Sequence, residues 1–150
     1  MVTLVIVVAV ALLLWRLRPA RPVRAPPPIL VIEDDPAQAY VLREHLLGVR
    51  GVVTANTLSE AEALLQRERF DILLLDLLLP DGSSVDLAVR VRHGRYLTPA
   101  HVPILLLTGL SLSADELLRV TQANACFFKP VDFPVLRRTV ERLLRDSHAN

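Results

Sequence analysis

The sequence is poor in lysine and cysteine, and each scarcity limits what the protein can be. A single cysteine, Cys126, excludes an internal disulfide framework and fits a reducing compartment. Of the 17 basic residues, Lys129 alone is a lysine. Because its ammonium group is a compact point charge and a guanidinium is a planar fork, a site that keeps lysine suits contact with a single phosphate oxygen.

Neither sign of charge predominates, since the formal net charge of the 150 residues is +1. Four arginines lie before residue 29 without an acid among them, so the remainder is slightly acidic. The composition therefore gives no indication of a basic surface that would bind nucleic acid. Apolar residues, by contrast, make up 52% of the chain, enough for the core of one domain.

One long hydrophobic run opens the chain and ends at Trp15, with Arg16 directly after it. Counted to residue 17, it makes a helix of about 24 Å, short for a hydrocarbon core of about 30 Å. Basic residues follow the run rather than precede it, which disfavours a signal peptide. We predict a membrane anchor at residues 1–17, with the following chain on the cytoplasmic side of the inner membrane. The alternatives are a wrongly assigned start or a fragment of a longer hybrid sensor or regulator.

Residues 18–28 form an Arg/Pro-rich linker, in which five prolines favour extended backbone. The folded unit is predicted at residues 29–146, and residues 147–150 form a tail. With no output domain expected after residue 146, the protein is expected to signal through contact with another protein.

Short apolar runs alternate with amphipathic runs throughout the folded unit. The runs typical of buried strands are 29–32, 52–55, 72–76, 104–107 and 126–128. The runs typical of helices are 36 to about 48, 59–69, 84–92, 114–123 and 133–145, with a turn at 80–82 before the third. Five strands joined by helical crossovers predict an α/β fold, a doubly wound five-stranded parallel sheet with five helices on its two faces.

Ligands of such sheets bind beyond the carboxyl ends of the strands, and the informative residues lie there. The first strand is followed by Glu33 and Asp34, the third ends in Asp76, the fourth is followed by Thr108, and the fifth by Lys129. Three carboxylates brought together repel one another unless a cation lies among them, and Mg²⁺ prefers such oxygen ligands. A carboxylate beside a lysine and a hydroxyl can also accept a phosphoryl group as an aspartyl-phosphate.

Four motifs at these strand ends resemble the receiver domain of bacterial two-component response regulators. They are Ile-Leu-Val-Ile-Glu-Asp-Asp-Pro at 29–36, Asp-Leu-Leu-Leu-Pro-Asp-Gly-Ser at 76–83, Leu-Leu-Leu-Thr-Gly at 105–109 and Phe-Lys-Pro at 128–130. The resemblance covers residues 29–146 and implies a flavodoxin-like sheet with strand order 2-1-3-4-5.

The resemblance also implies a phosphorylation-dependent switch with an Mg²⁺ site. Asp76 would be the phosphoryl acceptor and a metal ligand, Asp34 a direct ligand, and Glu33 a ligand through water. The backbone carbonyl of Leu78 would complete the set of protein ligands. Asp35 is expected to cap the helix that follows.

By the same resemblance, Lys129 would contact the phosphoryl oxygens and Thr108 would turn its hydroxyl toward the new phosphate. The phosphoryl group would come from a histidine kinase or a histidine phosphotransfer protein. A downstream protein would bind the face formed by the fourth helix, fifth strand and fifth helix. The protein would not be an enzyme beyond its own phosphorylation and slow dephosphorylation at Asp76.

Some positions depart from the family pattern. Cys126 stands three residues before the lysine, where receivers commonly have Tyr or Phe, so the coupling uses another side chain or is weaker. Ser84 stands where glycine is common. Leu78 and Leu110 are apolar where polar residues can position an attacking water, which predicts a long-lived phosphoryl state.

Three other interpretations account for fewer of these residues. A phosphorylation-independent binding module with the receiver fold would explain Cys126 but not the intact acids and lysine. A phosphatase with an aspartate nucleophile needs an acid two residues after it, where this chain has Leu78. A dinucleotide-binding domain needs a glycine-rich loop where this chain has acids.

Overall fold

Continuous apolar runs form the strands of the protein, and amphipathic runs form its helices. The computed structural model describes residues 25 and 27–148 of the chain. The strands are β1 (Ile29–Ile32), β2 (Val52–Ala55), β3 (Ile72–Asp76), β4 (Leu78–Leu79), β5 (Gly82–Ser83), β6 (Ile104–Thr108) and β7 (Ala125–Phe128). The helices are α2 (Pro36–Leu46), α3 (Leu58–Arg67), α4 (Ser84–Arg92), α5 (Ala114–Thr121) and α6 (Phe133–His148). Each strand and helix expected from the sequence is present.

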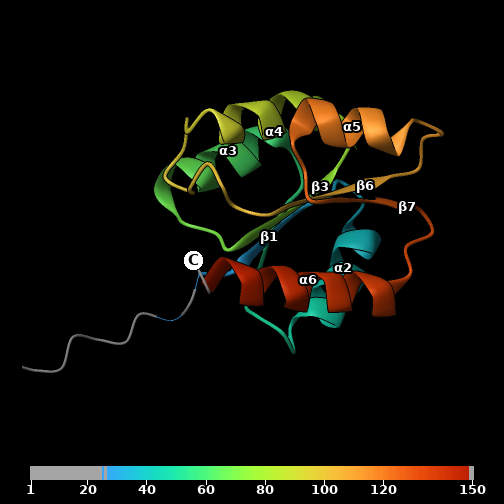
Figure 1. The fold of residues 1–150 in the computed structure, drawn as a ribbon, viewed down its shortest axis with the longest axis horizontal. Helices are drawn as coiled ribbons and strands as arrows, with labels where there is room; N and C mark the ends of the chain where they lie inside the picture. The colour runs from blue at the N-terminus through green and yellow to red at the C-terminus, as the bar shows by residue number, and fades with distance from the viewer. Residues whose placement is uncertain (1–24, 26, 149–150) are drawn as a thin grey trace, which may run out of the picture.

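Five of the strands form one parallel sheet in the order β2-β1-β3-β6-β7. Without the short β4 and β5, this is the expected order 2-1-3-4-5. Figure 1 shows α3, α4 and α5 over one face of the sheet and α2 and α6 over the other. The prediction of a doubly wound α/β fold is confirmed.

Alternate residues of the central strands supply two separate cores. In β1, Leu30 and Ile32 pack with the residues of α3, α4 and α5, whereas Ile29 and Val31 pack with those of α2 and α6. All residues of β1, β3 and β6 are buried, because helices cover both faces of these strands. This rigid centre fixes the carboxyl ends of β1 and β3, where the acidic residues lie.

A short hairpin interrupts the segment between β3 and α4. The sequence predicts only a turn at residues 80–82, and the structure adds an antiparallel pair, with Leu78 opposite Ser83 and Leu79 opposite Gly82. Gly82 has a φ of +148°, a backbone conformation that residues with a side chain rarely adopt. The hairpin therefore starts two residues after Asp76 and stands beside the acidic residues.

None of the helices in the described part of the chain is both long and apolar enough to cross a bilayer. The anchor predicted at residues 1–17, most of the linker at 18–28 and the last two residues of the predicted tail lie outside the described residues.

Candidate functional site

Three carboxylates meet at the carboxyl ends of β1 and β3. These strands are neighbours in the sheet, with Ile32 beside Leu75, so the residues that follow them are close. One carboxylate oxygen from each of Glu33, Asp34 and Asp76 lies within 4.8 Å of the others. Glu33 is 0% exposed and Asp76 6%, whereas Asp34 is open to solvent. The structure thus brings together the acids that the sequence analysis selected.

The ammonium group of Lys129 reaches into this cluster from the end of β7. Its Nζ lies 2.8 Å from Oε2 of Glu33 and 2.5 Å from Oδ2 of Asp76, and it donates a hydrogen bond to each. The sequence analysis expected contact with a phosphoryl group, and in this structure the lysine bridges two carboxylates. A straight-chain ammonium can fit between two carboxylates in this way, whereas the planar guanidinium of arginine is wider.

Charge at the site is unbalanced, since the three acids exceed the one lysine by two negative charges. Burial raises the pKa of Glu33, against the opposing effect of the hydrogen bond from Lys129. Burial alone would lower the pKa of Lys129, but its hydrogen bonds to Asp76 and Glu33 raise it overall. Lys129 therefore stays positively charged, and the remaining negative charge of the acids attracts a second cation.

Backbone amides and a hydroxyl hold the two buried acids in place. The amide of Leu78 donates to Oδ1 of Asp76 at 3.0 Å, and the amide of Asp35 donates to Oε1 of Glu33 at 3.2 Å. The hydroxyl of Ser84, at the start of α4, donates to the backbone carbonyl of Asp76. The sequence analysis missed all three contacts, although the Ser84 departure from the family pattern pointed to this position.

Asp35 caps the helix behind the acids, as the sequence predicts. Its Oδ1 accepts hydrogen bonds from the amides of Ala37 at 2.8 Å and Gln38 at 3.4 Å. The side chain of Gln38 also donates to the Asp35 carboxylate, and these contacts lower the pKa of Asp35. Asp35 is thus engaged by α2 and lies outside the cluster of three acids.

Thr108 lies beside the site, but its hydroxyl faces its own loop. The side chain is buried at the end of β6, and Oγ1 accepts a hydrogen bond from the amide of Leu110 at 3.0 Å. The backbone carbonyl of Thr108 accepts from the amide of Lys129 at 2.7 Å. Thr108 and Lys129 are therefore joined through their backbones, while the hydroxyl oxygen is bonded to the loop that follows β6.

The donor set fits Mg²⁺ on chemical grounds. Its ligand atoms are oxygens that carry excess negative charge, which a hard divalent cation prefers. Asp34 is exposed, so the cluster is open on one side to water and to a phosphate-bearing group. Glu33, Asp34 and Asp76 are the side chains that could hold the ion, with the backbone of Leu78 directly beside Asp76.

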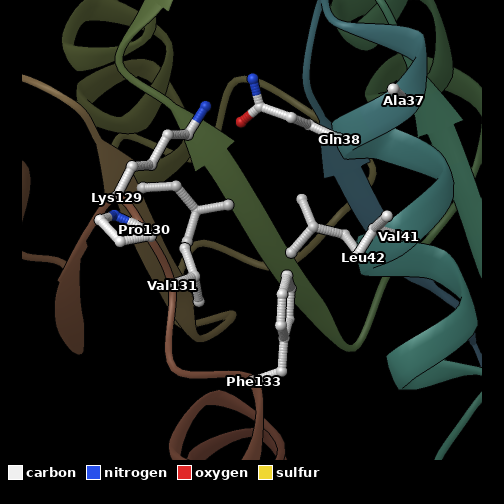
Figure 2. A pocket seen from close by; sticks show the side chains of 9 residues that line it. Ala37, Gln38, Val41, Leu42, Lys129, Pro130, Val131 and Phe133 are labelled. Carbon is white, nitrogen blue, oxygen red and sulfur yellow. The ribbon is translucent and has the colours of Figure 1, made fainter.

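An apolar pocket of about 310 Å³ opens next to Lys129 and was not expected from the sequence. Figure 2 shows it between α2 on one side and the segment from Lys129 to Phe133 on the other, with Leu42 and Phe133 facing each other across it. It is lined by Ala37, Gln38, Val41, Leu42, Leu107, Lys129, Pro130, Val131 and Phe133. Lys129 thus borders the pocket and also contacts two acids of the cluster.

Cys126 is not a fully exposed side chain. It is half-buried and packs against the core under α5, and burial raises the pKa of its thiol. Phe128 lies two residues further along β7, beside Thr108 in the sheet, and the residue is 46% exposed. Val120 of α5 is 51% exposed. The face predicted to bind a partner therefore carries exposed apolar side chains on α5 and β7.

Comparison with known proteins places this site in a family. A family model described as the response regulator receiver domain matches residues 29–141. The response regulator protein PilR of Pseudomonas aeruginosa is 36% identical over 122 residues, which cover 77% of this chain and 26% of PilR. The polar-differentiation response regulator DivK of Brucella anthropi is 28% identical over 125 residues, which cover 81% of this chain and 99% of DivK.

Solved structures agree with the sequence comparison. The non-phosphorylated HemR receiver domain of Leptospira biflexa has a TM-score of 0.68 and 34% identity, and the match covers 79% of this chain and 94% of that one. The chain is similar in extent to this domain and to DivK, but it spans about a quarter of the length of several other curated relatives.

Proposed function

Because the chain belongs to the response regulator receiver family, we propose that it is a switch in two-component signalling whose phosphoryl acceptor is Asp76. The observation that carries the proposal is the position of Lys129, whose Nζ contacts Asp76 and Glu33 within the acid cluster. A cation already in contact with the acceptor carboxylate can stabilise the charge of an incoming phosphoryl group. Asp76 is also held by the Leu78 amide, so its carboxylate is oriented before the reaction.

Mg²⁺ is the proposed cofactor, and the residues that would hold it are Glu33, Asp34, Asp76 and the backbone carbonyl of Leu78. When bound, the ion supplies positive charge that offsets the repulsion between the carboxylates and the phosphoryl oxygens. The support for this assignment is the oxygen-only cluster and its excess negative charge.

The proposed donor is a phosphohistidine on a histidine kinase or a phosphotransfer protein. A carboxylate oxygen of Asp76 attacks phosphorus, the P–O bond forms, and the P–N bond breaks. The bonding pair goes to the imidazole nitrogen, which takes up a proton and leaves as neutral histidine. Lys129 then exchanges one carboxylate contact for a contact with a phosphoryl oxygen. The Thr108 hydroxyl gives up its hydrogen bond from the Leu110 amide and donates to a second phosphoryl oxygen.

We further propose that the donor protein covers the apolar pocket beside Lys129. A protein that brings a phosphohistidine to Asp76 would come close to Lys129, which also lines the pocket, and burying Val41 and Phe133 would contribute affinity. The output face is proposed at α5, β7 and α6, where Val120 and Phe128 are exposed. The two proposed contacts meet at the start of α6, because Phe133, its first residue, also lines the pocket.

Leu78 and Leu110 bear on the lifetime of the phosphorylated state. Both side chains are exposed near the site, and neither can orient a water molecule for attack on phosphorus. We therefore expect slow dephosphorylation, measured as loss of phosphate from the purified protein with Mg²⁺ present. A half-life of only seconds would contradict this reasoning.

The deciding experiment is phosphorylation of the full chain by acetyl phosphate in the presence of Mg²⁺. Mass spectrometry should find one added phosphoryl group on the wild type and none on Asp76→Asn. Asp86→Asn, which changes an exposed acid in the first turn of α4, should be phosphorylated like the wild type. An unmodified wild type that still bound its partner would support the phosphorylation-independent binding module instead.

Anchoring of the switch to a membrane is a separate proposal that depends on residues 1–17. Its support is the apolar run followed by arginines in the sequence. Fractionation of cells that produce the full chain and a version beginning at residue 25 tests it. Equal distribution of the two proteins between membrane and soluble fractions would refute it.

A further inference from the structure

The β4–β5 hairpin is attached to the start of α3 by one side chain. Oδ1 of Asp81, in the turn of the hairpin, accepts a hydrogen bond from the amide of Leu58 at 2.8 Å. Oδ2 accepts from the amide of Ser59 at 3.0 Å and from its hydroxyl at 3.1 Å. Both carboxylate oxygens are thus used, and Asp81 caps a helix that lies 23 residues earlier in the chain.

Two further contacts show that the hairpin fits closely against α3. Leu79 is buried in the same core cluster as Leu58. A Cβ placed on Gly82 would lie 2.9 Å from Cδ1 of Leu58, so the backbone of the hairpin lies directly against this side chain. The turn and one strand of the hairpin are therefore fixed by α3.

Leu78, the first residue of the hairpin, has no such anchor of its own. Its side chain is 57% exposed, so burial does little to fix it. Its amide nevertheless holds Oδ1 of Asp76, and it pairs with Ser83 across the hairpin. The position of Leu78 relative to Asp76 thus depends on where the rest of the hairpin is held.

We propose that Asp81 is a positioning residue of the phosphorylation site, which acts by clamping the hairpin so that the backbone of Leu78 faces Asp76. This inference rests on the proposed function, in which the carbonyl of Leu78 completes the Mg²⁺ ligands. Loss of the clamp lets Leu78 move relative to Asp76, and a ligand set held less closely binds its ion more weakly.

A carboxylate is well suited to this role, because the amides of Leu58 and Ser59 point outward from the first turn of α3 as donors. Asparagine has one acceptor oxygen in place of two, so it cannot bind the two amides through separate oxygens as Asp81 does. The hydrogen bond from the Leu58 amide, followed by that from Ser59, lowers the pKa of Asp81, so the group stays ionised at neutral pH. The helix terminus also favours its negative charge.

The experiment compares Asp81→Ala with Thr57→Ala in the ¹⁵N-labelled full chain. Thr57 caps the same helix by accepting from the amide of Glu60 at 3.1 Å, and among the described residues its side chain makes no hydrogen bond to the hairpin. The two variants therefore weaken the same end of α3, and only the first releases the hairpin. Amide exchange of Leu78 is measured without metal, and Mg²⁺ is then titrated while the Leu78 and Asp76 amide signals are followed.

We expect Asp81→Ala to speed exchange of the Leu78 amide by about tenfold and Thr57→Ala by less than about threefold. The Kd for Mg²⁺ should rise roughly three- to tenfold in Asp81→Ala and stay near the wild-type value in Thr57→Ala. If Asp81→Ala does not fold, Asp81→Asn takes its place, with a smaller change in the same direction.

Equal effects of the two variants on Leu78 exchange or on Mg²⁺ affinity would overturn the proposal, because Asp81 would then only stabilise α3. Failure of the proposed function has a different signature, in which the wild type itself binds no Mg²⁺. The exchange measurement is made without metal, so it reports on the clamp in either case.

Discussion

Replacing Lys129 with methionine should destabilise the protein in the absence of divalent metal. Methionine keeps most of the length of the side chain but removes the charge that lies 2.8 Å from Glu33 and 2.5 Å from Asp76. Breaking a fully buried ion pair costs about 3–5 kcal/mol, because one charge is left without a partner. The Lys129 side chain is 20% exposed and Asp34 is open to solvent, so water screens part of that cost. We expect a loss of about 1–3 kcal/mol in the free energy of unfolding.

The assay is urea unfolding of the full chain, followed by circular dichroism, with a chelator and then with Mg²⁺. Arg142→Met is the matched control, since Arg142 pairs with Asp146 at 3.8 Å on the surface of α6. An exposed pair of this kind contributes at most about 1 kcal/mol, and Mg²⁺ should not alter its effect. In the Lys129 variant, Mg²⁺ should narrow the stability gap by supplying the missing positive charge. The reasoning is refuted if the two variants are equally stable in chelator, or if Mg²⁺ leaves the gap unchanged.

Three further results are expected from stability measurements. Arg92→Ala should lower the free energy of unfolding by about 2–3 kcal/mol, because the guanidinium donates to three loop carbonyls; Arg92→Lys should recover less than half of this loss in thermal unfolding. Gly82→Ala should cost about 1–3 kcal/mol in urea unfolding, since residues with a side chain rarely adopt a φ of +148° and the Leu58 methyl group at 2.9 Å would have to move. The folded pKa of Asp81 is depressed below its ordinary value of 3.8, so its stabilising contribution is present above that pH and is lost as pH falls through the folded pKa. The stability gap between wild type and Asp81→Ala should therefore narrow as the pH falls below 3.8, and a gap that does not change with pH would contradict the assignment.

The sheet could be predicted from the sequence because its strands are buried on both faces. A strand such as Ile72–Asp76 has apolar residues at every position until it reaches the edge, where a carboxylate appears. That change from apolar to acidic marks both the end of the strand and the start of the site. The same local signal located Glu33, Thr108 and Lys129, so their convergence followed from the fold.

The contacts that orient these residues could not be predicted in the same way. The cap from Asp81 to Leu58 joins residues 23 positions apart, and it depends on the distance between a hairpin and a helix. Such a distance is set by packing, here by Leu79 in the core and by the close approach at Gly82. The local sequence shows only residues that favour a turn, and these do not reveal which helix the turn will cap.

Lys129 shows a related limit. Its residue type indicated contact with phosphate, but its partners in this structure are Glu33 and Asp76. Sequence reasoning considered the bound state, in which phosphate is present, whereas an unpaired ammonium beside buried acids binds those acids first. The lysine therefore stabilises the fold in one state and is proposed to recognise the phosphoryl group in the other.

The structure also bears on how such a change could reach a partner without an aromatic residue at position 126. The amide of Lys129 is bonded to the carbonyl of Thr108, so a shift of the Lys129 backbone would reach the end of β6. The hydroxyl of Thr108 holds the amide of Leu110, and turning it toward a phosphoryl group would release the loop that follows. Phe128 lies beside Thr108 in the sheet and is already half exposed. It therefore places an aromatic ring two residues further along β7 than Cys126, nearer to the end of the strand. Coupling through the loop and Phe128 requires no movement of the half-buried thiol, so cysteine at position 126 is compatible with a working switch.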